Sequence, residues 1–116
     1  MNEYMLVYQG GDPDWAKNST PEEMGAAMAQ WGAWMGGLQA KEQLVSGGSP
    51  LHYSGKNIDS DKVVTDIAAS ELKELVSGYS IIKAASIDAA VEIAQQCPIF
   101  NHAGVKVQVR EIQQMG

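Results

Sequence analysis

The pattern of apolar and polar positions predicts three main strands. Residues 3–9 are apolar on both faces of an extended chain, which suits a strand in the middle of a sheet. Residues 78–84 are rich in β-branched side chains, which favours a second strand. Residues 105–110 alternate between valine and a polar residue, as in a strand with one buried face.

A long helix is predicted from Pro21 to about Gln43. Thr20 is placed to cap its first turn, and Glu23 is placed to complete a capping box. An apolar stripe follows at helical spacing, formed by Met24, Met28, Trp31, Met35 and Leu38. We expect this stripe to be buried, with Trp31 in the core and Trp34 on the flank. A second face holds small residues, which favours either close packing or simple exposure: Gly25, Ala29, Gly32 and Gly36.

A second helix is predicted to begin at Ser86. The Ser86 hydroxyl can cap the first turn, and Asp88 favours the positive N-terminal end of the helix. Pro98 ends it, because proline has no N–H to continue the hydrogen bonding. Its apolar face consists of Ile87, Ala90, Val91, Ala94 and Cys97.

The segment between the two helices carries weaker signals. Residues 46–50 predict a loop, and short strands are expected at 51–53 and 62–65. Residues 56–61 are polar and typical of a turn, whereas residues 71–76 predict a helical turn.

The resulting order is β-α-β, a short hairpin-like insertion, and β-α-β. This order predicts an α+β protein with a ferredoxin-like antiparallel sheet and both helices on one face. Either Met5 and Val7, or Tyr4, Leu6 and Tyr8, would then lie on the uncovered face. Because a large apolar surface calls for a partner, we expect a homodimer in which two sheets face each other.

Composition narrows the range of functions. The chain has 116 residues, of which 45% are hydrophobic and 19% charged, and this predicts a single globular domain over residues 1–116. The net charge of −6 argues against non-specific nucleic-acid binding, which requires clustered Lys and Arg. The apolar runs are too short for a membrane span, and the start does not resemble a signal peptide. We therefore expect neither a nucleic-acid nor a membrane partner.

The cysteine and histidine content bears on redox and metal chemistry. Cys97 is the single cysteine, so an internal disulfide and a cysteine-based metal cluster are excluded. A cytoplasmic location follows as the expectation. The two histidines, His52 and His102, do not form a local metal-binding spacing, so no metal and no cofactor are expected.

Three segments are similar to one protein family. Residues 65–79 align without gaps on the pattern T-D-G-P-F-A-E-T-K-E-x-x-x-G-Y. The matching positions are Thr65, Asp66, Glu71, Lys73, Glu74, Gly78 and Tyr79. Residues 4–8 and 104–111 are similar to the opening and closing strands of the same family. The chain therefore resembles the YCII-related family, in particular its DGPF branch, along nearly its whole length.

The resemblance implies a dimeric α+β barrel. A few similar proteins are enzymes, including one that removes chloride from a chlorinated hydroxyhydroquinone. The shorter members of the family are suspected of using a His–Asp pair whose histidine lies at the start of the first helix. Residues 19–28 contain no histidine here, which is a departure from that pattern.

Asp66 and His52 are the candidate catalytic residues. Asp66 follows a short predicted strand and matches the family motif. A carboxylate held in an apolar interior can serve as a general acid or base, with His52 or Tyr79 assisting. Alternatively, Asp66 caps the turn that follows it, and His52 lies on the surface.

The candidate ligand-binding residues are aromatic or able to pair with a polar group. An aromatic pocket would be lined by Tyr79, Trp34 and Tyr53. His102 lies in a predicted turn and can titrate near neutral pH. Arg110 can hold a ligand carboxylate in a bidentate pair, or it can form an ion pair with Glu3 or Glu111.

Three functions are consistent with these features. The preferred hypothesis is a protein that binds a small ligand. The first alternative is a cofactor-free enzyme that performs acid–base chemistry on a small phenolic or lactone-like substrate. The second alternative is a plain dimerisation module, in which side chains would fill the barrel interior.

Overall fold

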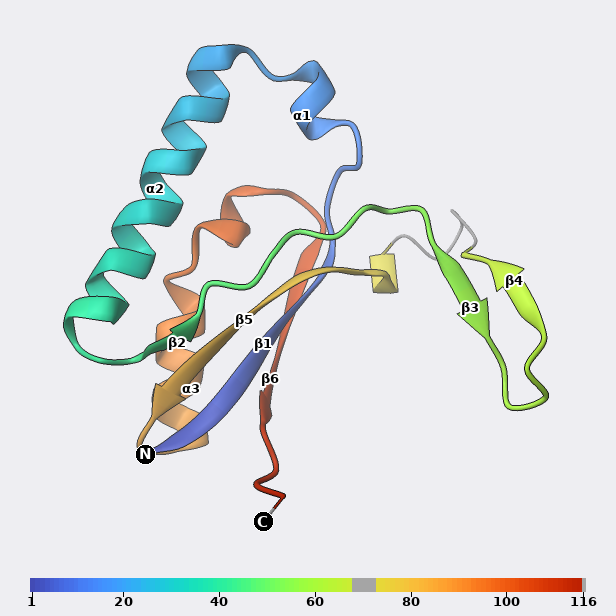
Figure 1. The fold of residues 1–116 in the computed structure, drawn as a ribbon. Helices are drawn as coiled ribbons and strands as arrows, with labels where there is room; N and C mark the ends of the chain where they lie inside the picture. The colour runs from blue at the N-terminus through green and yellow to red at the C-terminus, as the bar shows by residue number, and fades with distance from the viewer. Residues whose placement is uncertain (68–72, 116) are drawn as a thin grey trace.

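The computed structural model describes residues 1–67 and 73–115. Its elements are β1 (Asn2–Gly10), α1 (Trp15–Asn18), α2 (Pro21–Ala40), β2 (Leu44–Ser46), β3 (Lys56–Ile58), β4 (Val64–Asp66), β5 (Val76–Ala84), α3 (Ile87–Gln95), the 3₁₀ helix η2 (Pro98–Asn101) and β6 (Val105–Glu111). Four strands form an antiparallel sheet in the order β2-β5-β1-β6, and β3 and β4 form a separate hairpin (Figure 1). The predicted ferredoxin-like α+β fold is confirmed.

One face of the sheet carries the core. Tyr4, Leu6 and Tyr8 of β1 are buried there, in one cluster with residues of both long helices. The helix residues of this cluster are Leu38, Ala90 and Ala94. Met5 and Val7 therefore point to the other face, because successive side chains of a strand alternate. The structure thus decides between the two arrangements that the sequence left open.

Both predicted helix starts are confirmed. The Glu23 backbone N–H donates to the Thr20 hydroxyl at 3.1 Å, and the Thr20 N–H donates to the Glu23 carboxylate at 3.0 Å. At α3 the Ser86 hydroxyl accepts from the N–H of Ala89 at 3.1 Å. These local hydrogen bonds need only neighbouring residues, which is why the sequence pattern finds them.

Several predicted boundaries were wrong in the middle of the chain. Helix α2 ends at Ala40 instead of near Gln43, and the unpredicted strand β2 begins at Leu44. Residues 51–53 form no strand. The expected turn at 56–61 instead begins with β3, and the strand expected at 62–65 is β4. These strands are too short for periodicity to reveal them, because their pairing partners decide them.

The expected helical turn at 71–76 falls partly outside the described residues. Glu71 and Leu72 are not described, and Val76 already belongs to β5. Strand β5 therefore begins two residues earlier than predicted. The short helix α1 was not predicted either, since four residues carry no recognisable helical period.

Candidate functional site

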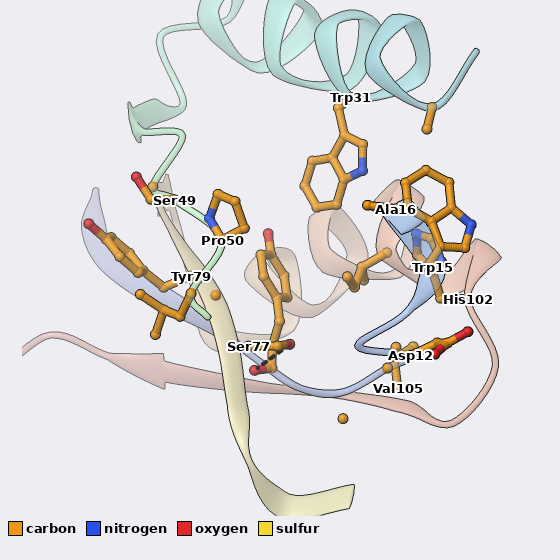
Figure 2. Close-up of a pocket in the computed structure, with 18 of the residues that line it drawn as sticks. Asp12, Trp15, Ala16, Trp31, Ser49, Pro50, Ser77, Tyr79, His102 and Val105 are labelled. Carbon is orange, nitrogen blue, oxygen red and sulfur yellow. Dashed lines mark hydrogen bonds between the residues drawn. The ribbon is translucent and has the colours of Figure 1, made fainter. Parts of the chain in front are cut away.

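A cavity of about 470 Å³ lies between residues 24–35 of α2 and the ends of the central strands (Figure 2). It is lined from α2 by Met24, Ala27, Met28, Trp31 and Met35, from the loop after β1 by Gly11, Asp12 and Pro13, and from α1 by Trp15 and Ala16. Further lining comes from residues 47–51, Tyr53, Ile99, His102 and Val105. Most of these side chains are apolar, which is typical of pockets for small molecules.

The cavity exists because only one end of α2 packs closely. Leu38, near the C-terminal end, is 7% exposed and belongs to the core. Met24 and Met28, near the N-terminal end, are 37% and 73% exposed. The stripe expected to be buried throughout therefore splits into a packed end and a cavity end.

The two ends of the cavity differ in chemistry. Ser49, Pro50 and Tyr79 lie at one end, and Trp15 and His102 lie at the other (Figure 2). The rings of Trp15 and His102 meet edge to face, with centroids 5.0 Å apart. The cavity therefore extends from the loop after β2 to the turn before β6.

Tyr8 and Ser80 form a buried polar network beside the cavity. The Tyr8 hydroxyl donates to the Ser80 hydroxyl at 2.8 Å, and Ser80 donates to the Gly47 carbonyl at 2.9 Å. The Cys97 thiol donates to the Tyr8 oxygen across 3.6 Å. Burial raises the pKa of Tyr8 well above its ordinary value, because the phenolate would lose its hydration. Tyr8 is therefore a neutral, fixed group.

Tyr53 ties one wall of the cavity to the loop after β1. Its hydroxyl donates to the Gly10 carbonyl at 2.9 Å. Burial raises the pKa of Tyr53, and the negative charge of Asp12 raises it further. The Asp12 carboxylate therefore acts on the same part of the cavity as this hydroxyl.

The cavity contains some of the ligand-binding residues expected from sequence. Tyr53 and His102 line it, and Tyr79 lies at its rim with its ring directed away from Trp31 (Figure 2). Trp34 lies outside it: its indole N–H donates to the Ile93 carbonyl at 3.4 Å, and its ring packs against the core. Trp31, expected in the core, packs against the core and also lines the cavity.

The other three expected residues lie elsewhere. Asp66 is on the β3–β4 hairpin, where its side chain is 79% exposed and pairs with Lys56 instead of entering an apolar interior. His52 borders a second, more open hollow of about 700 Å³, which Glu74 also lines. Arg110 is exposed on β6, opposite Met5, and in the part of the chain that is described it forms no ion pair.

Sequence reasoning missed Asp12, Trp15 and Trp31 as cavity residues. Asp12 and Trp15 follow directly after the central strand, and loops at strand ends commonly carry binding residues. That signal was present in the run from Gly10 to Asp14. Nothing in the sequence distinguished Trp31 from a core residue, because both environments select an apolar side chain at the same helical spacing.

A comparison with models of protein families identifies the family of this chain. A family model, the YCII-related domain, matches residues 4–115. The chain belongs to the YCII-related family. A comparison with curated proteins finds no match.

The motif of this YCII-related protein connects to the cavity through its last two residues. Gly78 and Tyr79 are on β5 at the cavity, whereas Asp66 is on the hairpin. A side chain at Gly78 would press on the Ser49 carbonyl, because its Cβ would lie 3.1 Å from that oxygen. The glycine thus permits the loop after β2 to approach β5.

The described residues of this YCII-related protein show neither a metal-ligand cluster nor a helix suited to a membrane. Within residues 1–67 and 73–115, no three His, Cys, Asp or Glu side chains come together as metal ligands would. None of the described helices combines the length and apolarity that crossing a bilayer requires.

Proposed function

We propose that this YCII-related protein binds a small, largely apolar molecule in the cavity beneath α2. The observation that carries the proposal is the cavity itself: about 470 Å³, walled by Trp15, Trp31 and Tyr53. Natural small-molecule sites have volumes of about 300–1,000 Å³ and mostly apolar walls. A plain dimerisation module would instead fill this space with side chains.

The wall is built to hold its shape. Trp31 meets Tyr8 and Trp34 edge to face, with ring centroids 5.8 Å apart in both pairs. Tyr8 is in turn fixed by Ser80. A rigid aromatic wall favours binding, because little side-chain freedom is lost when a ligand arrives.

Binding of an uncharged fluorescent dye, 1-N-phenylnaphthylamine, tests the proposal. We expect saturable binding with one dye per cavity. Ala27→Phe, which adds a ring to the cavity wall, is expected to weaken binding at least about tenfold, because it removes the space a ligand needs. Ala33→Phe is the matched control, because Ala33 is exposed on α2 and does not line the cavity.

Two results would contradict the proposal. The first is the absence of saturable dye binding by the wild-type protein. The second is equal dye binding by the two alanine variants, provided that circular dichroism shows both to be folded.

We also propose that the protein is a homodimer of the α+β barrel type. Four apolar side chains meet on the uncovered face of the sheet, where Met5 is opposite Ile81 and Val7 is opposite Tyr79. Gln108 and Arg110 border this open-face patch on β6. An apolar patch with a polar border is typical of a protein–protein interface.

Sedimentation velocity tests the dimer. The wild-type protein is expected to sediment as a dimer at micromolar concentration, and Val7→Lys as a monomer, because two buried lysines would face each other. Ala33→Lys on the outer face of α2 is the control and is expected to stay dimeric. A monomeric wild-type protein would overturn the proposal.

Within the family, we place the chain in the DGPF branch. The seven matching positions in residues 65–79 support this placement. The residues Gly-Pro-Phe of the motif are replaced by Ile67, Ala68 and Ala69, so the residues that name the branch differ here.

Acid–base catalysis is the second candidate function, because His102 lines the cavity. His102 is the one histidine in the described lining, and histidine is the most common general acid–base residue. Turnover of phenolic or lactone substrates would be compared in His102→Gln and Asp66→Asn. Loss of turnover only in His102→Gln would locate the chemistry in the cavity. Loss only in Asp66→Asn would locate it at the hairpin.

A further inference from the structure

The described cavity lining carries a negative charge and no permanent positive charge. In the described lining the only carboxylate is that of Asp12, and no lysine or arginine is present. The eight basic residues of the chain lie elsewhere, and the whole chain carries a net charge of −6. A bound anion would find no permanent positive partner here, and an unpaired charge is costly to place against apolar walls.

The turn after β1 holds Asp12 in place. Its Oδ1 accepts from the backbone N–H of Asp14 at 2.9 Å, and its carbonyl oxygen accepts from the N–H of Trp15 at 3.2 Å. A carboxylate has about four acceptor positions, so this turn leaves capacity for another donor. Asp12 lies at the same end of the cavity as Trp15 and His102 (Figure 2).

Three aromatic rings line the cavity whose border carries the exposed Asp12 carboxylate. Trp15, Trp31 and Tyr53 all line the cavity, and the face of such a ring attracts a cation electrostatically. Among aromatic rings, tryptophan gives the strongest attraction. A site with aromatic walls and one carboxylate contains the groups that recognise an ammonium ion.

We propose that the cavity selects an organic cation: a small amine or quaternary ammonium with an aromatic or alkyl body. The positive end lies toward Asp12 and the apolar body lies beneath Trp31. This assignment of ligand class rests on the ligand-binding function proposed above. It predicts that the affinities of ligands of one shape are ranked by their charge.

Three probes of similar shape test the ranking by displacing 1-N-phenylnaphthylamine. They are phenyltrimethylammonium, its uncharged isostere tert-butylbenzene, and benzenesulfonate. We expect the cation to bind about tenfold more tightly than the uncharged isostere, and the sulfonate to bind more weakly than both. Calorimetry with phenyltrimethylammonium provides a direct measurement that does not depend on the dye.

Asp12→Asn tests the role of the carboxylate. Asparagine keeps the oxygen that accepts from Asp14, so the turn is retained while the charge is lost. The variant is expected to bind tert-butylbenzene as the wild type does and to lose most of its preference for the cation. Asp14→Asn is the matched control: Asp14 carries the same charge two residues away but does not line the cavity.

The possible outcomes separate the two proposals. If the dye binds but tert-butylbenzene or benzenesulfonate competes as well as the cation, the assignment of an organic cation is wrong and ligand binding stands. A cation preference that persists in Asp12→Asn also overturns the assignment. If neither the dye nor phenyltrimethylammonium binds in any assay, both proposals fail.

Discussion

The two ends of helix α2 carry the same apolar stripe and have different roles. At the C-terminal end, Leu38 is buried against the sheet and Trp34 contacts α3. At the N-terminal end, Met24, Met28 and Trp31 border a cavity. The pattern of an amphipathic helix therefore indicates which face is turned inward, whereas the packing beneath the helix decides whether that face is core or binding site.

The packing differs because different elements lie beneath the two ends of α2. Beneath Leu38 the residues of β1 and α3 fill the interior, and Ala90 and Ala94 allow α3 to approach closely. Beneath Met28 the chain leaves the sheet: β1 ends at Gly10, and the loops 11–16 and 47–53 take its place. Loops form the cavity wall because they do not fill space as regularly as a helix or strand does.

The largest expected difference between the two ends is in stability. Leu38→Ala should lower the free energy of unfolding by about 2–5 kcal/mol, because it leaves a cavity in the core. Met28→Ala should change it by less than about 0.5 kcal/mol, because Met28 is mostly exposed. Urea denaturation of both variants measures the difference. Similar losses would show that the stripe is equally packed along its length.

The loop at the cavity end provides the next contrast. Gly48 has a φ of +70°, and a Cβ there would overlap the Tyr79 carbonyl oxygen. Gly48→Ala is therefore expected to lower the free energy of unfolding by about 1–3 kcal/mol and to weaken dye binding. Gly47→Ala is the matched control, because its Cβ would meet only the flexible Met35 side chain, at 3.0 Å. Equal thermal denaturation midpoints for the two variants would contradict this account.

Tyr8, between the two ends, should make stability depend on alkaline pH. Burial raises its pKa above the ordinary value near 10, so the unfolded chain releases this proton at lower pH than the folded one. The stabilisation is complete below about pH 10 and is lost as the pH rises further, because the unfolded state then binds fewer protons. Tyr8→Phe should cost about 1–2 kcal/mol at neutral pH, since Ser80 loses a partner.

Urea denaturation between pH 8 and 11 measures this effect. The stability of Tyr8→Phe should fall less steeply above pH 10 than that of the wild type. Tyr53→Phe is the control. The pKa of Tyr53 is also raised, but its ring is less buried, so this variant should change the pH profile less than Tyr8→Phe does. Parallel pH profiles for the wild type and Tyr8→Phe would contradict the assignment.

A substitution on the outer face of α2 should give the smallest change in stability, and this change should be an increase. Gly32 is exposed, and among the described residues no atom outside its own helix lies within 4 Å of a Cβ placed there. Gly32→Ala should raise stability by about 0.5–1 kcal/mol, the difference in helix propensity. A loss of stability would indicate that this face is packed in the assembled protein. Thermal denaturation gives the sign.

Much of the fold was predictable because its signals are local. The capping box at Thr20, the cap at Ser86 and the alternation in residues 105–110 each depend on neighbours in the chain, and all three are confirmed. The hairpin at 56–66 was misplaced, because strands of three residues are defined by their partner. Of the expected ligand-binding residues, Tyr53 and His102 line the cavity, whereas Tyr79 reaches only its rim and directs its ring to the open face of the sheet.

The sequence by itself determined the three main strands, the helix starts and the family, since these depend on residue types at short spacings. Tertiary structure alone decided that Trp31 faces the cavity while Trp34 packs against α3, and that Asp66 lies on an exposed hairpin. It also brought Asp12 and His102, 90 residues apart in the chain, to one end of the same cavity. The physical reason is that burial depends on which surfaces meet, and that depends on chain packing over long range.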